Sequence, residues 1–216
     1  MLPASSYICN ANLISSYTKD MIKKWLTVSN LLTGLLLAAV LLLAVNHYSK
    51  SLLLRGMMRV GFYQPKLSPP GNKKVENPVI PDLSFKDNNG QLINLAGQKG
   101  KVVFIDFWAT WCPYCIAEMP AINDLYKKLK SNPNVIFIIA DTDHDFIKSA
   151  KFMAKHQYSL PVHSLIGGLP RSISDGTIPL TIILDKNGHI VYKNTGTADY
   201  SNPAMLEYID RLALAK

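Results

Sequence analysis

Cysteine is scarce in this chain of 216 residues, which contains only Cys9, Cys112 and Cys115. A tetrahedral structural zinc site needs four ligands, so the pair at 112 and 115 lacks the second half that such a site requires. An inert structural disulfide is also disfavoured, because a bridge across so short a loop removes little conformational entropy from the unfolded chain. A redox-active dithiol is the better explanation of the pair.

Acidic residues are almost missing from the first third of the chain. Residues 1–75 hold nine Lys or Arg and one Asp, whereas residues 76–216 are balanced, so the formal net charge of +8 lies entirely in the first segment. These cations flank an apolar run, which suits anionic lipid headgroups better than a base-reading surface. The sequence therefore predicts no nucleic-acid partner.

Charged side chains are absent from residues 25–45, which are dominated by Leu, Ala and Val. At about 1.5 Å per residue, a helix of this length can cross a hydrocarbon core of roughly 30 Å. The long preceding segment, 1–24, and the poor cleavage site around residue 45 favour an uncleaved anchor over a signal peptide. We therefore expect residues 25–45 to form a transmembrane helix in contact with the lipid bilayer. Within roughly 15 to 20 residues of its ends, three basic residues lie on each side (Lys19, Lys23 and Lys24 before it, and Lys50, Arg55 and Arg59 after it), so charge predicts no orientation.

The rest of the chain divides at a proline-rich stretch. Residues 46–76 are expected to form a juxtamembrane segment and linker. Within it, residues 51–62 suit either a helix at the membrane interface or a continuation of the anchor. Residues 77–216 are expected to form one α/β domain.

Apolar periodicity in that domain predicts an N-terminal β-hairpin followed by the order β-α-β-α-β-β-α. Asn-Gly pairs mark the turns of the first and last hairpins, and short runs of Val, Ile and Phe suit buried strands. Alternation that ends in a hairpin predicts a mixed sheet with helices on both faces. The expected strands are 83–85, 91–95, 101–107, 135–140, 180–184 and 189–194, and the expected helices are 113–130, 143–156 and one from 203 onward.

Cys112 stands where an apolar strand gives way to a helix. If it caps that helix, its sulfur lies among unpaired backbone N–H groups at the positive end of the helix dipole, which favours thiolate over thiol. A thiolate attacks disulfides, whereas a thiol does not.

Further along the chain, Asp141, Asp143 and Asp145 alternate as at the start of a calcium-binding loop. The glycine and the distal glutamate of such a loop are missing, which favours a capped helix start.

Several motifs together resemble the TlpA/ResA-like branch of the thioredoxin superfamily. They are the run FWATWCPYC at 107–115, the trailing Glu118-Met119-Pro120, and Thr177-Ile178-Pro179 before an apolar strand. The resemblance covers roughly residues 78–216 and implies a thioredoxin-like fold. Members of this branch are commonly tethered at the outer face of bacterial inner membranes. The resemblance thus implies a single-pass protein with residues 1–24 in the cytoplasm and the C-terminal domain in the periplasm.

The same resemblance implies the roles of five residues. Cys112 becomes the exposed nucleophile, Cys115 the buried resolving thiol, and Pro179 a cis-proline beside the active disulfide. Asp106 matches the buried acid of thioredoxins, where ResA-like proteins often have asparagine, and Glu118 matches an acid typical of the ResA-like group. A carboxylate buried near thiols has a raised pKa and can take the proton of Cys115, so either acid is a candidate base.

The expected substrate surface comprises Trp111, Pro113, Tyr114 and Ile178. The implied function is reduction of periplasmic protein disulfides, in thiol quality control or cytochrome c maturation. A membrane electron donor would reduce the disulfide of the domain again after each cycle, and the domain would need no cofactor beyond that disulfide. The glutaredoxin-like Pro113-Tyr114 dipeptide leaves the direction of electron flow open. Two alternatives therefore stay open: a disulfide-forming oxidase or isomerase, and a copper-binding metallochaperone module with His163 as a distant ligand.

Overall fold

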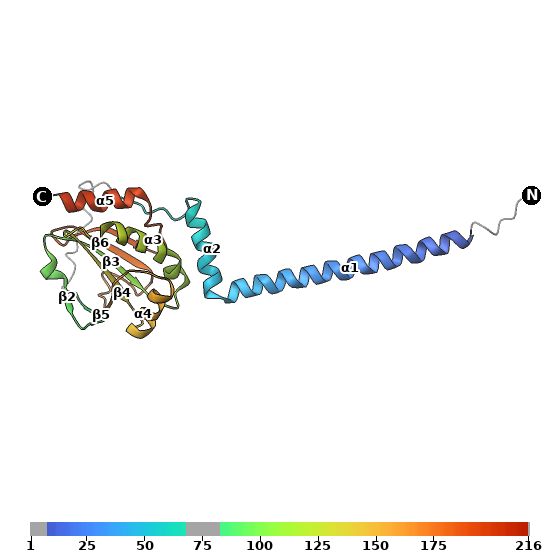
Figure 1. Ribbon diagram of the computed structural model, residues 1–216, viewed down its shortest axis with the longest axis horizontal. Helices are drawn as coiled ribbons and strands as arrows, with labels where there is room; N and C mark the ends of the chain where they lie inside the picture. The colour runs from blue at the N-terminus through green and yellow to red at the C-terminus, as the bar shows by residue number, and fades with distance from the viewer. Residues whose placement is uncertain (1–7, 68–82, 216) are drawn as a thin grey trace, which may run out of the picture. The chain divides into compact units, whose positions relative to one another are not determined.

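A computed structural model describes residues 8–67 and 83–215 (Figure 1). The chain forms two units, one ending at Asn46 and the other beginning at His47. The predicted domain boundary at residues 76–77 and most of the predicted proline-rich linker lie outside the described residues.

The first unit is dominated by one long helix, α1, which runs from Ile8 to Val45. Its stretch Lys23–Leu42 has 20 residues and a mean hydropathy of 2.0, with none of the stretch buried. By length and composition this stretch qualifies as a membrane-spanning helix, and a signal sequence would meet the same criteria.

The second unit begins with helix α2, His47–Arg59, after the single non-helical residue Asn46. It packs on helix α3, Pro113–Leu129, where Leu54 and Met58 form a small buried cluster with Ala117. From the sequence, this region was expected to be an interfacial helix or a continued anchor, and the contact with α3 was not predicted.

A mixed sheet of seven strands forms the centre of the second unit, in the order β2-β1-β5-β4-β3-β6-β7. The strands β3, β4 and β5 run parallel to one another, and the remaining pairs are antiparallel. This arrangement confirms the predicted α/β class with a mixed sheet. The strands are β1 Ser84–Asp87, β2 Leu92–Asn94, β3 Val102–Trp108, β4 Val135–Asp141, β5 Val162–Ile166, β6 Leu180–Leu184 and β7 Ile190–Thr195.

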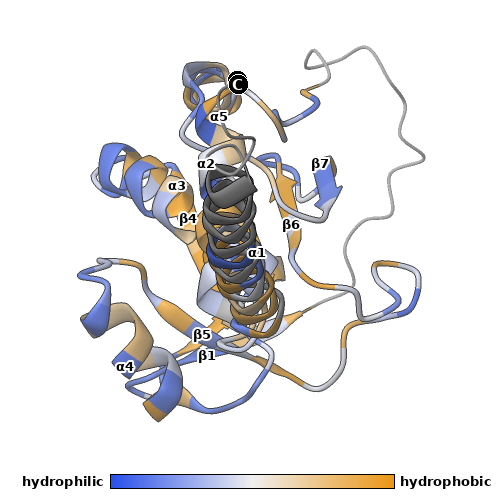
Figure 2. Ribbon diagram, turned by 90° about the vertical axis from the view of Figure 1, so that its right-hand side faces the viewer, coloured by the Kyte–Doolittle hydropathy of each residue, from blue (hydrophilic) through white to orange (hydrophobic). Residues whose placement is uncertain are grey.

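Side-chain alternation along the strands separates two hydrophobic clusters, one on each face of the sheet. Val102, Phe104 and Trp108 of β3 join the cluster that contains residues of α3, α4 (Phe146–Lys155) and α5 (Pro203–Leu214). The intervening residues of β3 join the other cluster. Because Asp106 shares the parity of Phe104 and Trp108, its carboxyl lies on the helix-covered face. Strand β6 is buried at every position and is largely hydrophobic (Figure 2).

The second face of the sheet has less helical cover than expected. Among the described residues, Leu95 is the one buried member of this cluster that lies in a helix, the short 3-10 helix η1 (Leu95–Gln98). Leu83 and Ile173 complete the cover from non-helical segments.

Strand β5 was not predicted from the sequence. This strand interrupts its apolar residues with His163 and Ser164 and follows Pro161, so it lacks the continuous apolar run of the central strands. Tertiary pairing defines it, since β5 lies between β4 and β1 in the sheet. Helix α4 also begins later than predicted, at Phe146, because Asp145 is its N-cap and accepts the Lys148 N–H at 3.0 Å.

Candidate active site

The two cysteines lie at the junction of β3 and α3. Cys112 is the N-cap of α3, and its Sγ accepts the backbone N–H of Cys115 at 3.2 Å. Pro113 occupies the first helical position, where its missing N–H costs no helical hydrogen bond. The predicted cap is therefore present, and the two sulfurs are joined in a disulfide.

Both cysteines are buried in this oxidised form. Cys112 retains 3% of its surface and Cys115 none, so Cys112 is much less exposed than the sequence analysis expected. The physical reason is that the Cys112 side chain belongs to the same hydrophobic cluster as Trp108 and Ile116. The accessible surface at this end of α3 comes from its neighbours, Trp111 and Tyr114, which are 60% and 53% exposed.

The peptide bond between Ile178 and Pro179 is cis, as predicted. Pro179 is buried, and its carbonyl accepts the Gly196 N–H at 2.9 Å, which ties the start of β6 to the end of β7. Ile178 is half-buried and packs against the hydrophobic clusters of both faces.

Asp106 is completely buried on the helix-covered face of β3. Thr181 lies directly opposite it in the antiparallel register and donates its hydroxyl to Asp106 Oδ1 at 3.1 Å. Tyr200 in turn donates its hydroxyl to Thr181 Oγ1 at 2.6 Å. Burial raises the pKa of Asp106 to about 7, and the hydrogen bond from Thr181 opposes that rise.

Glu118 is the second buried acid of the site. Its Oε2 accepts the backbone N–H of Ala198 at 3.1 Å. Burial, reinforced by the nearby negative charge of Asp106, raises the pKa of Glu118 well above its usual range, while the Ala198 N–H acts in the opposite direction. In the described part of the chain, Asp106 Oδ2 and Glu118 Oε1 have no hydrogen-bond partner. Two such groups do not both ionise at neutral pH, so the pair holds a proton there.

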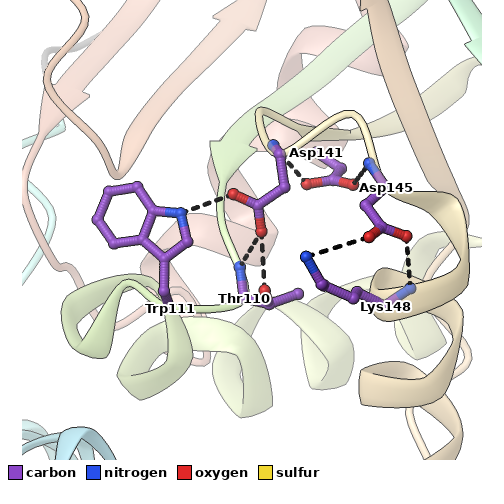
Figure 3. Close-up of polar contacts among 6 residues, drawn as sticks. Thr110, Trp111, Asp141, Asp145 and Lys148 are labelled. Carbon is purple, nitrogen blue, oxygen red and sulfur yellow. Dashed lines mark hydrogen bonds and ion pairs between the residues drawn. The ribbon is translucent and has the colours of Figure 1, made fainter.

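Asp143, just after β4, holds the loop that precedes Cys112. Asp143 accepts the Thr110 N–H at 3.0 Å, the Thr110 hydroxyl at 2.7 Å and the indole N–H of Trp111 at 2.6 Å (Figure 3). Asp141 accepts the backbone N–H groups of Asp143 and Asp145. The capped helix start was therefore the correct alternative, and the cluster also positions the exposed Trp111 beside the disulfide.

Thr181 and Tyr200 were not predicted as site residues from the sequence. Thr181 had a usable signal, because it is the one polar residue in the apolar run of β6 and a buried hydroxyl needs a partner. Tyr200 had none, since its contact with Thr181 depends on the path of the chain between β7 and α5.

His163 does not support the copper alternative. It pairs with Ala140 in the sheet register, and Ala140 belongs to the hydrophobic cluster on the face opposite to the cysteines. His163 is also buried, and its Nδ1 accepts the Ile139 N–H at 3.3 Å. Desolvation lowers its pKa to about 4, which reflects packing rather than exposure to a ligand site.

A Cys-x-x-Cys disulfide at a helix N-terminus, a cis-proline and a buried acid on the helix-covered face of the sheet define a thioredoxin-like oxidoreductase. The family model for Redoxin matches residues 74–208, more than half of the chain, and the chain belongs to that family. Within it, the chain is similar to the thiol-disulfide oxidoreductase ResA of Bacillus cereus, with 35% identity over 141 residues, 63% of this chain and 76% of the relative. ResA of Bacillus subtilis is 31% identical over 126 residues, 56% of this chain and 68% of the relative.

Solved structures agree with this assignment. A solution structure described as a protein disulfide isomerase from Bacteroides thetaiotaomicron has a TM-score of 0.55 and 25% identity, covering 63% of this chain and 88% of the other. A crystal structure described as a thiol-disulfide oxidoreductase from Bacteroides vulgatus has a TM-score of 0.51 and 31% identity, covering 62% and 93%. The protein is a ResA-like thiol-disulfide oxidoreductase.

The raised pKa of Asp106 predicts a pH-dependent stability. The folded state keeps this proton up to about pH 7, whereas the unfolded chain releases it near pH 3.8, so stability falls as pH rises between these values. Replacing the group by Asp106→Asn removes that loss. We expect the variant to gain about 2–4 kcal/mol on the wild type between pH 4.5 and pH 8, measured by urea unfolding.

The matched control is Asp124→Asn, the same chemical change at an exposed position of α3. It should follow the wild-type pH profile. Parallel profiles for Asp106→Asn and wild type would show that Asp106 ionises normally in the folded protein.

Proposed function

We propose that the protein is a membrane-anchored reductase of protein disulfides that works through the Cys112–Cys115 pair. The observation that carries the proposal is that Cys112 Sγ caps the N-terminus of α3, while two buried carboxyls with raised pKa values, Glu118 and Asp106, lie on the same helix and on the strand before it. Helix N-terminal N–H groups favour the thiolate of Cys112, and a carboxylate poised near neutral pH can accept and return a proton.

The reaction proceeds in two exchange steps. In the reduced protein, the Cys112 thiolate attacks one sulfur of the substrate disulfide, which forms a mixed disulfide and releases the other substrate sulfur as a thiolate. Asp106 or Glu118 then takes the proton of Cys115. The Cys115 thiolate attacks Cys112 Sγ, forms the internal disulfide and releases the reduced substrate. Two electrons pass to the substrate, and a membrane electron donor restores the dithiol.

The surface around the disulfide binds the substrate. Trp111 and Tyr114 provide exposed aromatic area, and aromatic side chains bury much surface at contacts. The half-buried Pro113 and Ile178 complete this surface, and the cis bond sets the direction of the backbone between Ile178 and Pro179. The substrate class is an extended protein segment that carries a disulfide.

The apolar stretch of α1 supports the location. We infer that residues 25–45 anchor the chain in a bacterial inner membrane, with residues 1–24 in the cytoplasm and the domain in the periplasm, where the ResA-like branch commonly acts. Disulfides persist in that compartment, so a reductase there has substrates in thiol quality control and cytochrome c maturation.

The resolving role of Cys115 can be tested by trapping. A Cys115→Ser variant can make the mixed disulfide but cannot release it, so we expect covalent adducts with client proteins on non-reducing gels. Cys112→Ser is the matched control and should give none. Absence of adducts from Cys115→Ser, together with tight copper binding by the reduced protein, would favour the metallochaperone alternative.

Kinetic measurements can show which carboxylate takes the proton of Cys115. Asp106→Asn should slow resolution of a model mixed disulfide by roughly a hundredfold at pH 7, without slowing the first attack of Cys112. Stopped-flow measurement of the two phases separates them, with Asp124→Asn as control. An unchanged resolution rate in Asp106→Asn, with a slow one in Glu118→Gln, would transfer the role to Glu118.

The direction of electron flow can be tested by measuring the reduction potential of the full chain in detergent. We expect a value near the roughly −270 mV of thioredoxin, measured by equilibration with glutathione or dithiothreitol. A value near the roughly −120 mV of DsbA would instead identify a disulfide-forming oxidase.

A further inference from the structure

The inner face of α2 is an integral part of the domain. Leu54 and Met58 are buried against Ala117 of α3, and Ser51 beside them is also buried. The segment after the helix continues the contact, because the Tyr63 carbonyl accepts the Asp199 N–H at 2.9 Å. Helix α2 therefore has a fixed inner side.

One polar contact explains why α2 binds at this place on α3. Pro120 has no N–H, so the carbonyl of Ile116, four residues earlier, has no helical donor. Arg55 of α2 donates Nη2–H to that carbonyl at 2.8 Å. The arginine thus satisfies a backbone group that the proline leaves open, one residue after Cys115.

The outer face of α2 is apolar and open. Leu52 and Leu53 are 69% and 68% exposed, and they lie on the side of the helix opposite to Leu54 and Met58. Val60, the residue after the last one of α2, is 74% exposed. Lys50 and Arg59 are exposed on the two flanks of this stripe. Residues 47–67 contain no Asp or Glu. We call Leu52, Leu53 and Val60, with Lys50 and Arg59, the outer face.

Position in the chain and charge indicate what covers the outer face. A single residue, Asn46, separates α2 from α1, and the apolar stretch of α1 ends at Leu42. If α1 spans the membrane as proposed, the first turns of α2 begin at headgroup depth. An apolar stripe between cations is the pattern of a helix that lies in an anionic lipid interface.

We propose that the outer face is a membrane-docking surface for an anionic bilayer. Leu52, Leu53 and Val60 enter the boundary between headgroups and acyl chains, and Lys50 and Arg59 meet anionic headgroups. Helix α2 then lies between the lipid and α3, and it holds the redox domain at the bilayer surface. This inference rests on the proposed anchoring through α1.

The test uses the full chain with Cys9→Ser, in which the Cys112–Cys115 disulfide leaves no free thiol. A spin label is attached through Leu53→Cys, and the protein is reconstituted in vesicles of phosphatidylcholine and phosphatidylglycerol. The matched control is Leu92→Cys in β2, because Leu92 is also a leucine with 68% exposure. Collision with a water-soluble nickel chelate and with oxygen reports whether each label lies in water or in lipid.

We expect the label at 53 to be several-fold less accessible to the nickel chelate than the label at 92, and more accessible to oxygen. Replacing phosphatidylglycerol by phosphatidylcholine, or introducing Lys50→Glu with Arg59→Glu, should reduce that difference. Equal nickel accessibility at 53 and 92 would overturn the proposal. Dipolar broadening between labels at 53 would also overturn it, because a second copy would then cover the face.

Two further measurements on the same vesicles separate this proposal from the proposed function. Extraction of the chain by alkaline carbonate would overturn both the anchoring and the docking. Retention of the chain with a water-accessible label at 53 overturns the docking alone. Disulfide reduction by the reconstituted protein, assayed on insulin, tests the reductase function whatever the position of α2.

Discussion

The burial of the Asp106 carboxyl on the helix-covered face of β3 is the constraint on which the site depends. A carboxyl at that depth needs hydrogen-bond donors, and the structure provides the Thr181 hydroxyl, itself held by Tyr200. Because strand β6 begins just after Pro179 and Leu180 pairs with Phe107, the same register that places Thr181 opposite Asp106 also places the cis-proline near the C-terminal end of β3. Acid and proline are therefore positioned together by one strand pairing.

The second acid extends this arrangement to the loop between β7 and α5. Glu118 reaches that loop from α3 and accepts the Ala198 N–H, while Thr197 donates its hydroxyl to the Tyr114 carbonyl at 3.3 Å. Two contacts thus join the first turns of α3 to the C-terminal part of the sheet. A change in the charge of Glu118 would weaken or strengthen one of them, so proton transfer and the local geometry of the dithiol helix are linked.

Much of the fold and of the candidate site could be predicted from the sequence, and the features that could not be predicted share one cause. The central strands, α3 and the capping cysteine follow from local patterns: a continuous apolar run, helical periodicity and a Cys-x-x-Cys at the junction. Strand β5, the Thr181–Tyr200 chain and the contact of Arg55 with Ile116 all depend on residues far apart in the sequence. Asp143 lies between these cases, because its place before α4 was predictable but its three bonds to Thr110 and Trp111 were not.

The replacement of a missing helical donor by Arg55 has a practical consequence for the boundaries of the domain. The region matched by the Redoxin model starts at residue 74, after α2 has ended. A chain truncated there would expose Ala117 to water and leave the Ile116 carbonyl without its guanidinium, directly beside Cys115. The folded unit of this protein is therefore larger than the region that the Redoxin model matches, and a fragment that preserves the surroundings of the Cys112–Cys115 helix has to include α2.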